Sequence, residues 1–259
     1  MTTANLTRTT RVRETRATYR LRLAATQDDL RAAQRLRFEV FNLELGEGLA
    51  ASHALGRDED AYDAYCDHLI VEREDTGEIV GTYRLQTGQL AAAHLGYYSE
   101  QEFDFAPYEP LRCELVELGR ACVHRDHRHL GVLGLLWRGI VIYARERQAR
   151  YLIGCSSLTS QDPAIGAATH AYFQDQGFTA EPHLLSLPTP AFACSLDIIA
   201  ADYPPPPKLL RTYLSIGAKI CGPPAIDREF GTIDFLTLLD LHALSDAAKT
   251  HFGQAPDDR

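Results

Sequence analysis

Short apolar or alternating runs, and longer runs with helical spacing, divide the chain into strands and helices. The short runs predict strands over residues 19–24, 68–72, 79–85, 151–155, 220–221 and 233–239. The longer runs predict a helix from a cap at Thr26 or Asp28 to Phe41, and helices over 131–147, from 161 to about 177, and over 208–216. Residues 44–60 lack either pattern and are expected to form a loop.

These elements predict one α/β domain over residues 19–259. Residues 1–18 are polar and rich in arginine, and we expect them to form a disordered basic arm.

One apolar run is interrupted by charge and carries the candidate chemistry. It reads Glu117-Leu-Gly-Arg120-Ala-Cys-Val, enters a turn rich in His and Arg, and continues as an apolar helix from Gly131. A strand, a cationic turn and a helix N-terminus can together bind the phosphate-bearing arm of an acyl carrier, because N–H groups and the helix dipole converge on an anion. Glu117 lies where a carboxylate can accept a proton from an attacking amine. The pattern indicates an enzyme.

Composition excludes several other classes of protein. A net charge of −9 argues against a general nucleic-acid binder, and no apolar run reaches the ~18 residues that a membrane-spanning helix needs. The six cysteines form no Cys-x-x-Cys pair, which is typical of reduced thiols in a cytoplasmic protein. We therefore expect a cytoplasmic protein, with peripheral contact at the inner membrane surface left open, and neither a metal nor a bound cofactor.

Several short segments, taken in order, resemble one family. They include Leu36-Arg37-Phe-Glu-Val-Phe41, Gly81-Thr-Tyr-Arg84, Glu117-Leu-Gly-Arg120 and Tyr151-Leu-Ile-Gly-Cys. Their order and spacing over residues 20–250 resemble the GNAT-fold ornithine-lipid N-acyltransferases, often labelled putative hemolysins, and more distantly the acyl-homoserine lactone synthases. The resemblance implies a three-layer fold in which helices flank a central mixed, mostly antiparallel, twisted sheet.

The same resemblance implies an activity and a set of site residues. The activity is transfer of a 3-hydroxy fatty acyl group from acyl carrier protein to an amino acid α-amine, with L-ornithine as the first candidate acceptor, giving lyso-ornithine lipid. The carrier's phosphopantetheine thioester is a co-substrate. Residues corresponding to the active site of the lactone synthases are Arg37, Phe41, Asp60, Asp63, Arg84, Glu117 and Arg120. We expect Glu117 and Arg120 to be catalytic, and the other charged residues of this set to bind substrate.

Two departures from the family patterns narrow the function. The lactone synthases have a tryptophan shortly after Phe41, but the only Trp here is Trp137, which favours simple amide formation. The GNAT phosphate loop keeps Arg128 and Gly131, but Leu133 replaces its small residue, and Gly134 comes one position late. A carrier protein presents one phosphate here, so the change counts against free coenzyme A. The expected donor-binding residues are Cys122, Val123, Arg125, Arg128, Gly131 and Gly134.

Strand geometry leads to a further expectation. Residues three apart in a regular strand face opposite sides, so Glu117 and Arg120 cannot both line one pocket unless the strand is irregular. Gly119 between them predicts a β-bulge. The alternative for Glu117 is simple pairing with an arginine in a sheet.

Other candidate residues keep alternatives open. Tyr213, four residues before Gly217, matches the GNAT tyrosine that protonates the leaving thiolate, and Phe173 before Gly177 is a rival match. Asp60 and Asp63 either pair internally with Arg37 and Arg84, which we rank first, or bind the ammonium groups of ornithine; their spacing matches no common metal site. Asp227 is a further candidate for the δ-ammonium.

The expected partners are acyl carrier protein and ornithine, with no nucleic acid; the sequence leaves the oligomeric state open. Arg125, Arg128, Arg138 and Arg145 form a candidate cationic face for the acidic carrier protein. The alternatives are a lactone synthase, an acyl-coenzyme A-dependent N-acyltransferase, and a non-enzymatic module that binds lipid or carrier protein.

Overall fold

The computed structural model describes residues 10–14, 17–128 and 130–244, which form two compact units. The first unit takes its described residues from Met1–Gln86 and Leu118–Ala149, and the second takes them from Thr87–Glu117 and Arg150–Lys249. The chain therefore passes from the second unit to the first within a single strand, β5, between Glu117 and Leu118.

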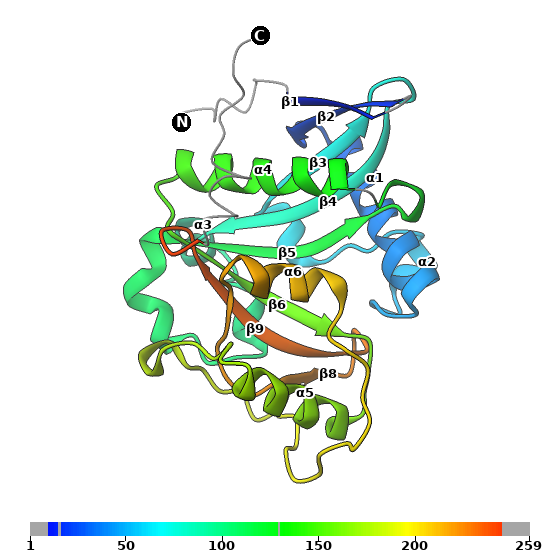
Figure 1. The fold of residues 1–259 in the computed structure, drawn as a ribbon. Helices are drawn as coiled ribbons and strands as arrows, with labels where there is room; N and C mark the ends of the chain where they lie inside the picture. Colours follow the sequence, from blue (N-terminus) through cyan, green and yellow to red (C-terminus); the bar gives the residue numbers. More distant parts are fainter. Residues whose placement is uncertain (1–9, 15–16, 129, 245–259) are drawn as a thin grey trace. The chain divides into compact units, whose positions relative to one another are not determined.

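The first unit is built on an antiparallel sheet (Figure 1). Its elements are β1 (Thr10–Glu14), β2 (Ala17–Leu23), α1 (Gln27–Phe38), α2 (Ser52–Leu55), β3 (Asp67–Arg73), β4 (Glu78–Thr87), the end of β5 (Leu115–Val123) and α4 (Leu130–Glu146). Each of the strands from β1 to β4 pairs with the next in antiparallel fashion. Helix α4 packs on β2 and β3, and a Cβ atom at Gly139 would lie 2.7 Å from the side chain of Leu69. Glycine therefore allows the close approach of helix and sheet.

Local chemistry fixes the start of α1. The Thr26 hydroxyl accepts the N–H of Asp29, and the Asp29 carboxylate accepts the N–H of Thr26, which forms a capping box. The helix continues as a wider, π-helical segment, Glu39–Leu45. It ends at Gly46, whose φ of 69° lies in the left-handed region that glycine adopts without strain.

The second unit combines parallel and antiparallel pairing. Its elements are α3 (Gly88–Ala93), the start of β5, β6 (Tyr151–Leu158), α5 (Pro163–Asp175), α6 (Lys208–Ile216), β7 (Lys219–Ile220), β8 (Ala225–Asp227) and β9 (Thr232–Asp240). Residues Leu115 to Glu117 of β5 pair in parallel with β6. Strand β9 is antiparallel to β6, β7 and β8.

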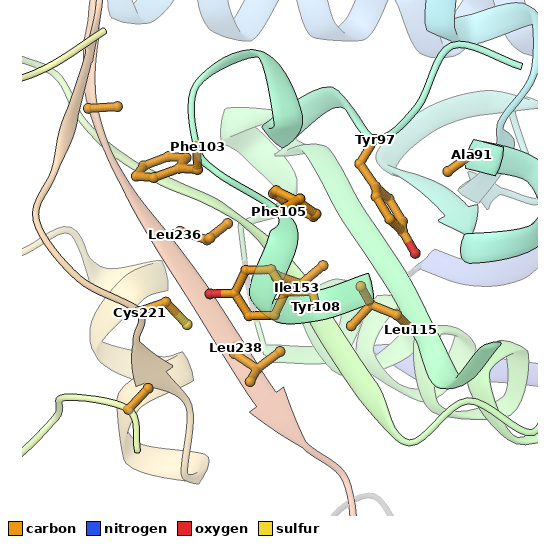
Figure 2. Close-up of a cluster of buried hydrophobic side chains, with 12 residues drawn as sticks. Ala91, Tyr97, Phe103, Phe105, Tyr108, Leu115, Ile153, Cys221, Leu236 and Leu238 are labelled. Carbon is orange, nitrogen blue, oxygen red and sulfur yellow. The ribbon is translucent and has the colours of Figure 1, made fainter. Parts of the chain in front are cut away.

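Two apolar clusters hold the second unit together. One is drawn in Figure 2, where Tyr97, Phe105 and Tyr108 meet Ile153 of β6 and Leu238 of β9. In the other, α5 and α6 cover the strands, and its buried side chains are Leu158, Phe173, Cys194, Leu210, Leu214, Ile220, Ile226, Ile233 and Phe235. Burial of each large apolar side chain contributes about 1.5–3 kcal/mol, so these clusters position the loops that carry the polar residues.

Most predicted elements are confirmed, and some expectations are corrected. Thr26 caps the first helix, and Gly217 ends α6 with φ of 112°. The expected loop at 44–60 contains the short helix α2, and β8 was missed because three residues carry little periodic signal.

The expected disorder of residues 1–18 is wrong for Thr10–Glu14, which pair with β2, and for Ala17 and Thr18, which begin β2. Residues 1–9 and 15–16 of that predicted arm lie outside the described residues. The prediction of one domain over 19–259 stays a prediction. Within the described part of the chain, every helix is too short or too polar to cross a membrane.

Candidate active site

Strand β5 is irregular close to the residues expected to be catalytic. Arg120 has a φ of 49°, a left-handed backbone that a residue other than glycine rarely adopts. The irregularity that Gly119 predicted is therefore present, one residue later than expected. Such a conformation costs of order 1 kcal/mol and persists only where the surroundings hold it. Arg120 is held by ion pairs of its Nε to Asp58 (3.3 Å) and of its Nη2 to Asp60 (3.1 Å).

Glu117 lies in the second unit, buried among polar donors. Its Oε2 accepts the N–H of Tyr98 at 2.8 Å, and its Oε1 accepts the N–H of Ser99 at 2.8 Å and the Ser99 hydroxyl at 2.6 Å. These donors belong to the 3-10 turn Tyr98–Gln101 and hold the carboxylate by both of its oxygens. Backbone and hydroxyl groups of this turn are thus among the partners of Glu117, and its catalytic role stays a prediction.

The first unit contains an Arg–Asp network, formed by Arg37, Arg84, Arg120, Asp58, Asp60 and Asp63. Arg37 is fully buried and binds Asp63 through two nitrogens (2.9 and 2.6 Å) and Asp58 through Nε (2.8 Å). Arg84 Nη1 binds both oxygens of Asp60, at 2.6 and 2.7 Å. Internal ion pairing, the first of the two alternatives for Asp60 and Asp63, is thus confirmed.

The three arginines and three aspartates of this network balance one another in charge, and their side chains are largely buried. Burial acts to raise the pKa of Asp63, but Arg37 and Arg84 hold that pKa below its usual range. The same competition between burial and the guanidinium groups of Arg84 and Arg120 leaves the pKa of Asp60 lowered. Burial also lowers the pKa of His68, whose Nε2 lies 3.1 Å from the carbonyl oxygen of Asp63. The network therefore fixes the loop 58–63 against α1 and β4 rather than presenting unbalanced charge.

The expected donor-binding residues lie where β5 meets α4. Cys122 is buried, and burial raises the pKa of its thiol. Arg125 is exposed in the short turn Arg125–His127, and Arg128 donates from Nε to the carbonyl oxygen of Val123 at 3.0 Å. Gly131 and Gly134 belong to the first turns of α4, and a Cβ atom at Gly134 would meet open space. These residues lie together where β5 meets α4, and their binding of the donor stays a prediction.

Tyr213 lies on α6, half-buried against the second apolar cluster. Its rival, Phe173, is fully buried in the same cluster, with Tyr172 half-buried beside it. Because Phe173 has no ionisable group and is sealed in the core, Tyr213 and Tyr172 are the two phenols that remain as candidate acids.

The second unit also contains an acidic cluster, formed by Glu102, Asp227 and Asp234. Their carboxylate oxygens lie within 4.8 Å of one another, and all three residues are buried. Burial raises the pKa of Asp234, which also accepts hydrogen bonds from the hydroxyls of Ser157 and Thr232. Among the described residues, this is the group whose geometry can hold a cation. The expectation that no metal takes part stays a prediction.

A short polar chain links Glu117 to this cluster within the second unit. The Cys155 thiol lies 3.4 Å from the Ser99 hydroxyl and 3.7 Å from Glu102 Oε2. Ser99 in turn donates to Glu117. Only two side chains therefore separate the expected base from the acidic cluster.

Several residues of these sites escaped the sequence analysis. Asp58 carried no spacing signal that separated it from the other acidic residues nearby. Ser99 and Glu102 belong to irregular segments, where periodicity says nothing. Asp234 did carry a signal, since it is a carboxylate inside the apolar run Ile233-Asp-Phe-Leu.

Comparison with known proteins places the chain among acyltransferases. Residues 36–138 match the family model described as an acetyltransferase (GNAT) domain. The chain is 33% identical to an L-ornithine N(alpha)-acyltransferase of Brucella abortus (strain 2308), with 90% of this chain and 88% of that protein covered. It is 30% identical to a protein of the same name from Agrobacterium fabrum (strain C58 / ATCC 33970), with 91% and 85% covered.

A solved structure supports the fold. The crystal structure of the AHL synthase LasI matches with a TM-score of 0.52 at 10% identity, and 94% of this chain and 99% of that chain are covered. The mixed sheet flanked by helices is thus the GNAT-like fold that the family resemblance implied.

Proposed function

This chain belongs to the family of L-ornithine N(alpha)-acyltransferases, and we propose that it moves a 3-hydroxy fatty acyl group from acyl carrier protein to the α-amine of L-ornithine, giving lyso-ornithine lipid. The observation that carries the proposal is the similarity to relatives of that name over nine tenths of the chain. The buried, polar setting of Glu117 supports the chemistry that such a transfer needs.

In the proposed reaction, the α-amine attacks the thioester carbonyl, the C–S bond breaks and an amide C–N bond forms. An α-ammonium with a pKa of about 8 is mostly protonated at neutral pH, so a base must accept a proton. Glu117 accepts that proton, directly or through one water, an effect worth about 10²–10⁴-fold. The N–H of Ser99, its hydroxyl and the N–H of Tyr98 hold the carboxylate in one orientation.

The leaving thiolate needs a proton, and we assign Tyr213 as the donor. This phenol lies at the C-terminal half of α6, a rigid element that ends at Gly217. A phenol has an ordinary pKa of about 10, which suits protonation of a thiolate.

We assign the acidic cluster to the δ-ammonium of ornithine. Asp60 and Asp63 are already balanced by arginine, whereas Glu102, Asp227 and Asp234 bring three buried carboxyl groups within 4.8 Å of one another, a geometry that suits a cation. Ser99 and Cys155 link Glu117 to Glu102 within this unit. In this scheme Glu117 serves the α-amine that reacts, and the acidic cluster of the same unit binds the δ-ammonium. Asp227 keeps the role expected from the sequence.

The donor assignment rests on the cationic turn. Arg125 and Arg128 present guanidinium groups beside the first turn of α4, which suits the single phosphate of a carrier-bound pantetheine. No cofactor takes part in this scheme other than that co-substrate thioester.

The proposal is tested by supplying the purified protein with 3-hydroxyacyl carrier protein, or with the same acyl group on coenzyme A, and L-ornithine. Mass spectrometry should detect ornithine acylated at the α-amine, formed faster from the carrier protein. Norvaline, which lacks the δ-ammonium, should react poorly, and Nδ-acyl-ornithine should not form. Acylation of norvaline at the rate of ornithine would refute the role of the acidic cluster, and no amide product with any amino acid would refute the proposed function.

A further inference from the structure

The cationic turn already holds an anion, which the chain itself supplies. Arg128 makes a bidentate contact with the carboxylate of Glu44, from Nη1 to Oε1 at 2.5 Å and from Nη2 to Oε2 at 2.7 Å. The third guanidinium nitrogen donates to the carbonyl oxygen of Val123. Both arginine and carboxylate are partly exposed, with side-chain exposures of 42% and 28%. A ligand from solution can therefore reach this pair.

Helix geometry alone does not favour Glu44 at this place. It lies in the last turn of the helical run formed by α1 and the π-helical segment, one residue before Leu45 and the terminal Gly46. The C-terminal end of a helix carries a partial negative charge, which repels a carboxylate. Arg128, and after it Arg125 and His124, lower the pKa of Glu44, so the cationic turn stabilises its charge. The cationic turn, rather than the end of the helix, therefore holds the Glu44 carboxylate in place.

We propose that Glu44 occupies the position of the donor's phosphate in the free protein, and that phosphopantetheine must displace it from Arg128 to bind. The inference rests on the donor part of the proposed function. Carboxylate and phosphate offer arginine the same bidentate pair of oxygens, so they compete for one guanidinium. A carrier-bound phosphopantetheine is a phosphodiester with one negative charge, and it exchanges for one carboxylate without change in net charge.

This contact makes Glu44 a selectivity residue for the donor. An anion that reaches Arg128 gains its full set of hydrogen bonds, while a ligand without a phosphate leaves the Arg128–Glu44 pair in place. The displaced pair is partly exposed, and such pairs contribute modestly to stability. Removal of the Glu44 charge should therefore tighten donor binding by about 3- to 10-fold.

The test measures binding of holo-acyl carrier protein, which carries phosphopantetheine, and of apo-acyl carrier protein, which lacks it. Glu44→Gln should bind the holo form about 3- to 10-fold more tightly than the unchanged protein does and leave binding of the apo form unaltered. The matched control is Asp28→Asn, which removes the same charge from an almost fully exposed side chain on α1. This control should alter neither affinity.

A second comparison uses Arg128→Gln. This change should weaken binding of the holo form, and adding Glu44→Gln to it should have no further effect, because the contested guanidinium is gone. Three results would each overturn the inference. Glu44→Gln could bind the apo and holo forms equally more tightly, it could still tighten binding in the Arg128→Gln background, or it could leave the affinity for the holo form unchanged. If the holo form responds as expected but no acyl-ornithine forms, the donor inference stands and the proposed function fails.

Discussion

At the scale of single residues, the Arg–Asp network is a set of charges that stabilise one another only while the set is complete. Arg37 is fully buried between Asp58 and Asp63. Replacement by Met should lower the free energy of unfolding by about 3–5 kcal/mol, because it leaves carboxylates buried without their partner. Urea unfolding followed by circular dichroism measures this.

The control for that change is Arg57→Met. Arg57 pairs with Glu59 at 3.0 Å, but both side chains are about one third exposed. Its loss should cost less than about 1 kcal/mol. Equal costs for the two variants would contradict the view that burial gives the network its importance.

Tyr213 and Tyr172 form a natural pair for testing the acid. Both phenols are half-buried against the same apolar cluster, so replacing either by Phe removes one oxygen from a similar setting. Tyr213→Phe should reduce kcat by about 10-fold or more, since thiolate departure loses its proton donor, and Tyr172→Phe should leave kcat unchanged. Steady-state release of thiol measures both. The reverse order would transfer the acid role to α5.

At the scale of elements, the first turn of α1 predicts part of the pH dependence of stability. The hydrogen bonds and charge of Arg22 hold the pKa of Asp29 well below its usual value of 3.8. A carboxyl with a lowered pKa in the folded state stabilises above its ordinary pKa and loses that contribution as pH falls below it. Asp29→Asn should therefore lose about 0.5–2 kcal/mol at pH 7, and its deficit should shrink between about pH 4 and pH 2.

Urea unfolding at several pH values tests this, with Asp28→Asn as the control. Asp28 is the neighbouring carboxylate in the same turn, and its side chain is 95% exposed. The control should follow the unchanged protein at every pH. A deficit for Asp29→Asn that stays constant in acid would show that its carboxylate contributes no more than a neutral cap.

Elements with strong local signals were predictable from the sequence, and those without were not. The Thr26 cap and the helix over 208–216 are set by residues close in the chain, and both were predicted. The strand at Thr10–Glu14 and the three residues of β8 depend on pairing with distant partners.

The candidate site shows the same division. The spacing of residues 117–131 was enough to predict an irregular strand and a cationic turn. Glu44 and the acidic cluster arise only when segments far apart in sequence are folded together, as with Glu44 and Arg128, which are 84 residues apart. No local pattern could have predicted these contacts.

At the scale of the whole molecule, net charge and local charge point in opposite directions. The protein carries −9, yet Arg125, Arg138 and Arg145 are exposed or half-buried around the donor turn and α4. We predict that kcat/KM with the acidic carrier protein falls steeply as salt rises and that Arg145→Gln lowers it about 2- to 5-fold at low salt. With an acyl-pantetheine donor, which lacks the protein, neither effect should appear. Salt-independent kinetics with the carrier protein would contradict electrostatic docking.

The most direct test of the central claim is the pH dependence of single-turnover acyl transfer to ornithine by Glu117→Gln. At pH 7 its rate should be about 10²–10⁴-fold below that of the unchanged protein, measured at a temperature where circular dichroism shows the variant folded, since its amide cannot accept all three hydrogen bonds. The gap should narrow above about pH 8, where the free amine needs less help from a base. A variant that transfers the acyl group at the unchanged rate at pH 7 would show that Glu117 only anchors the turn at Ser99.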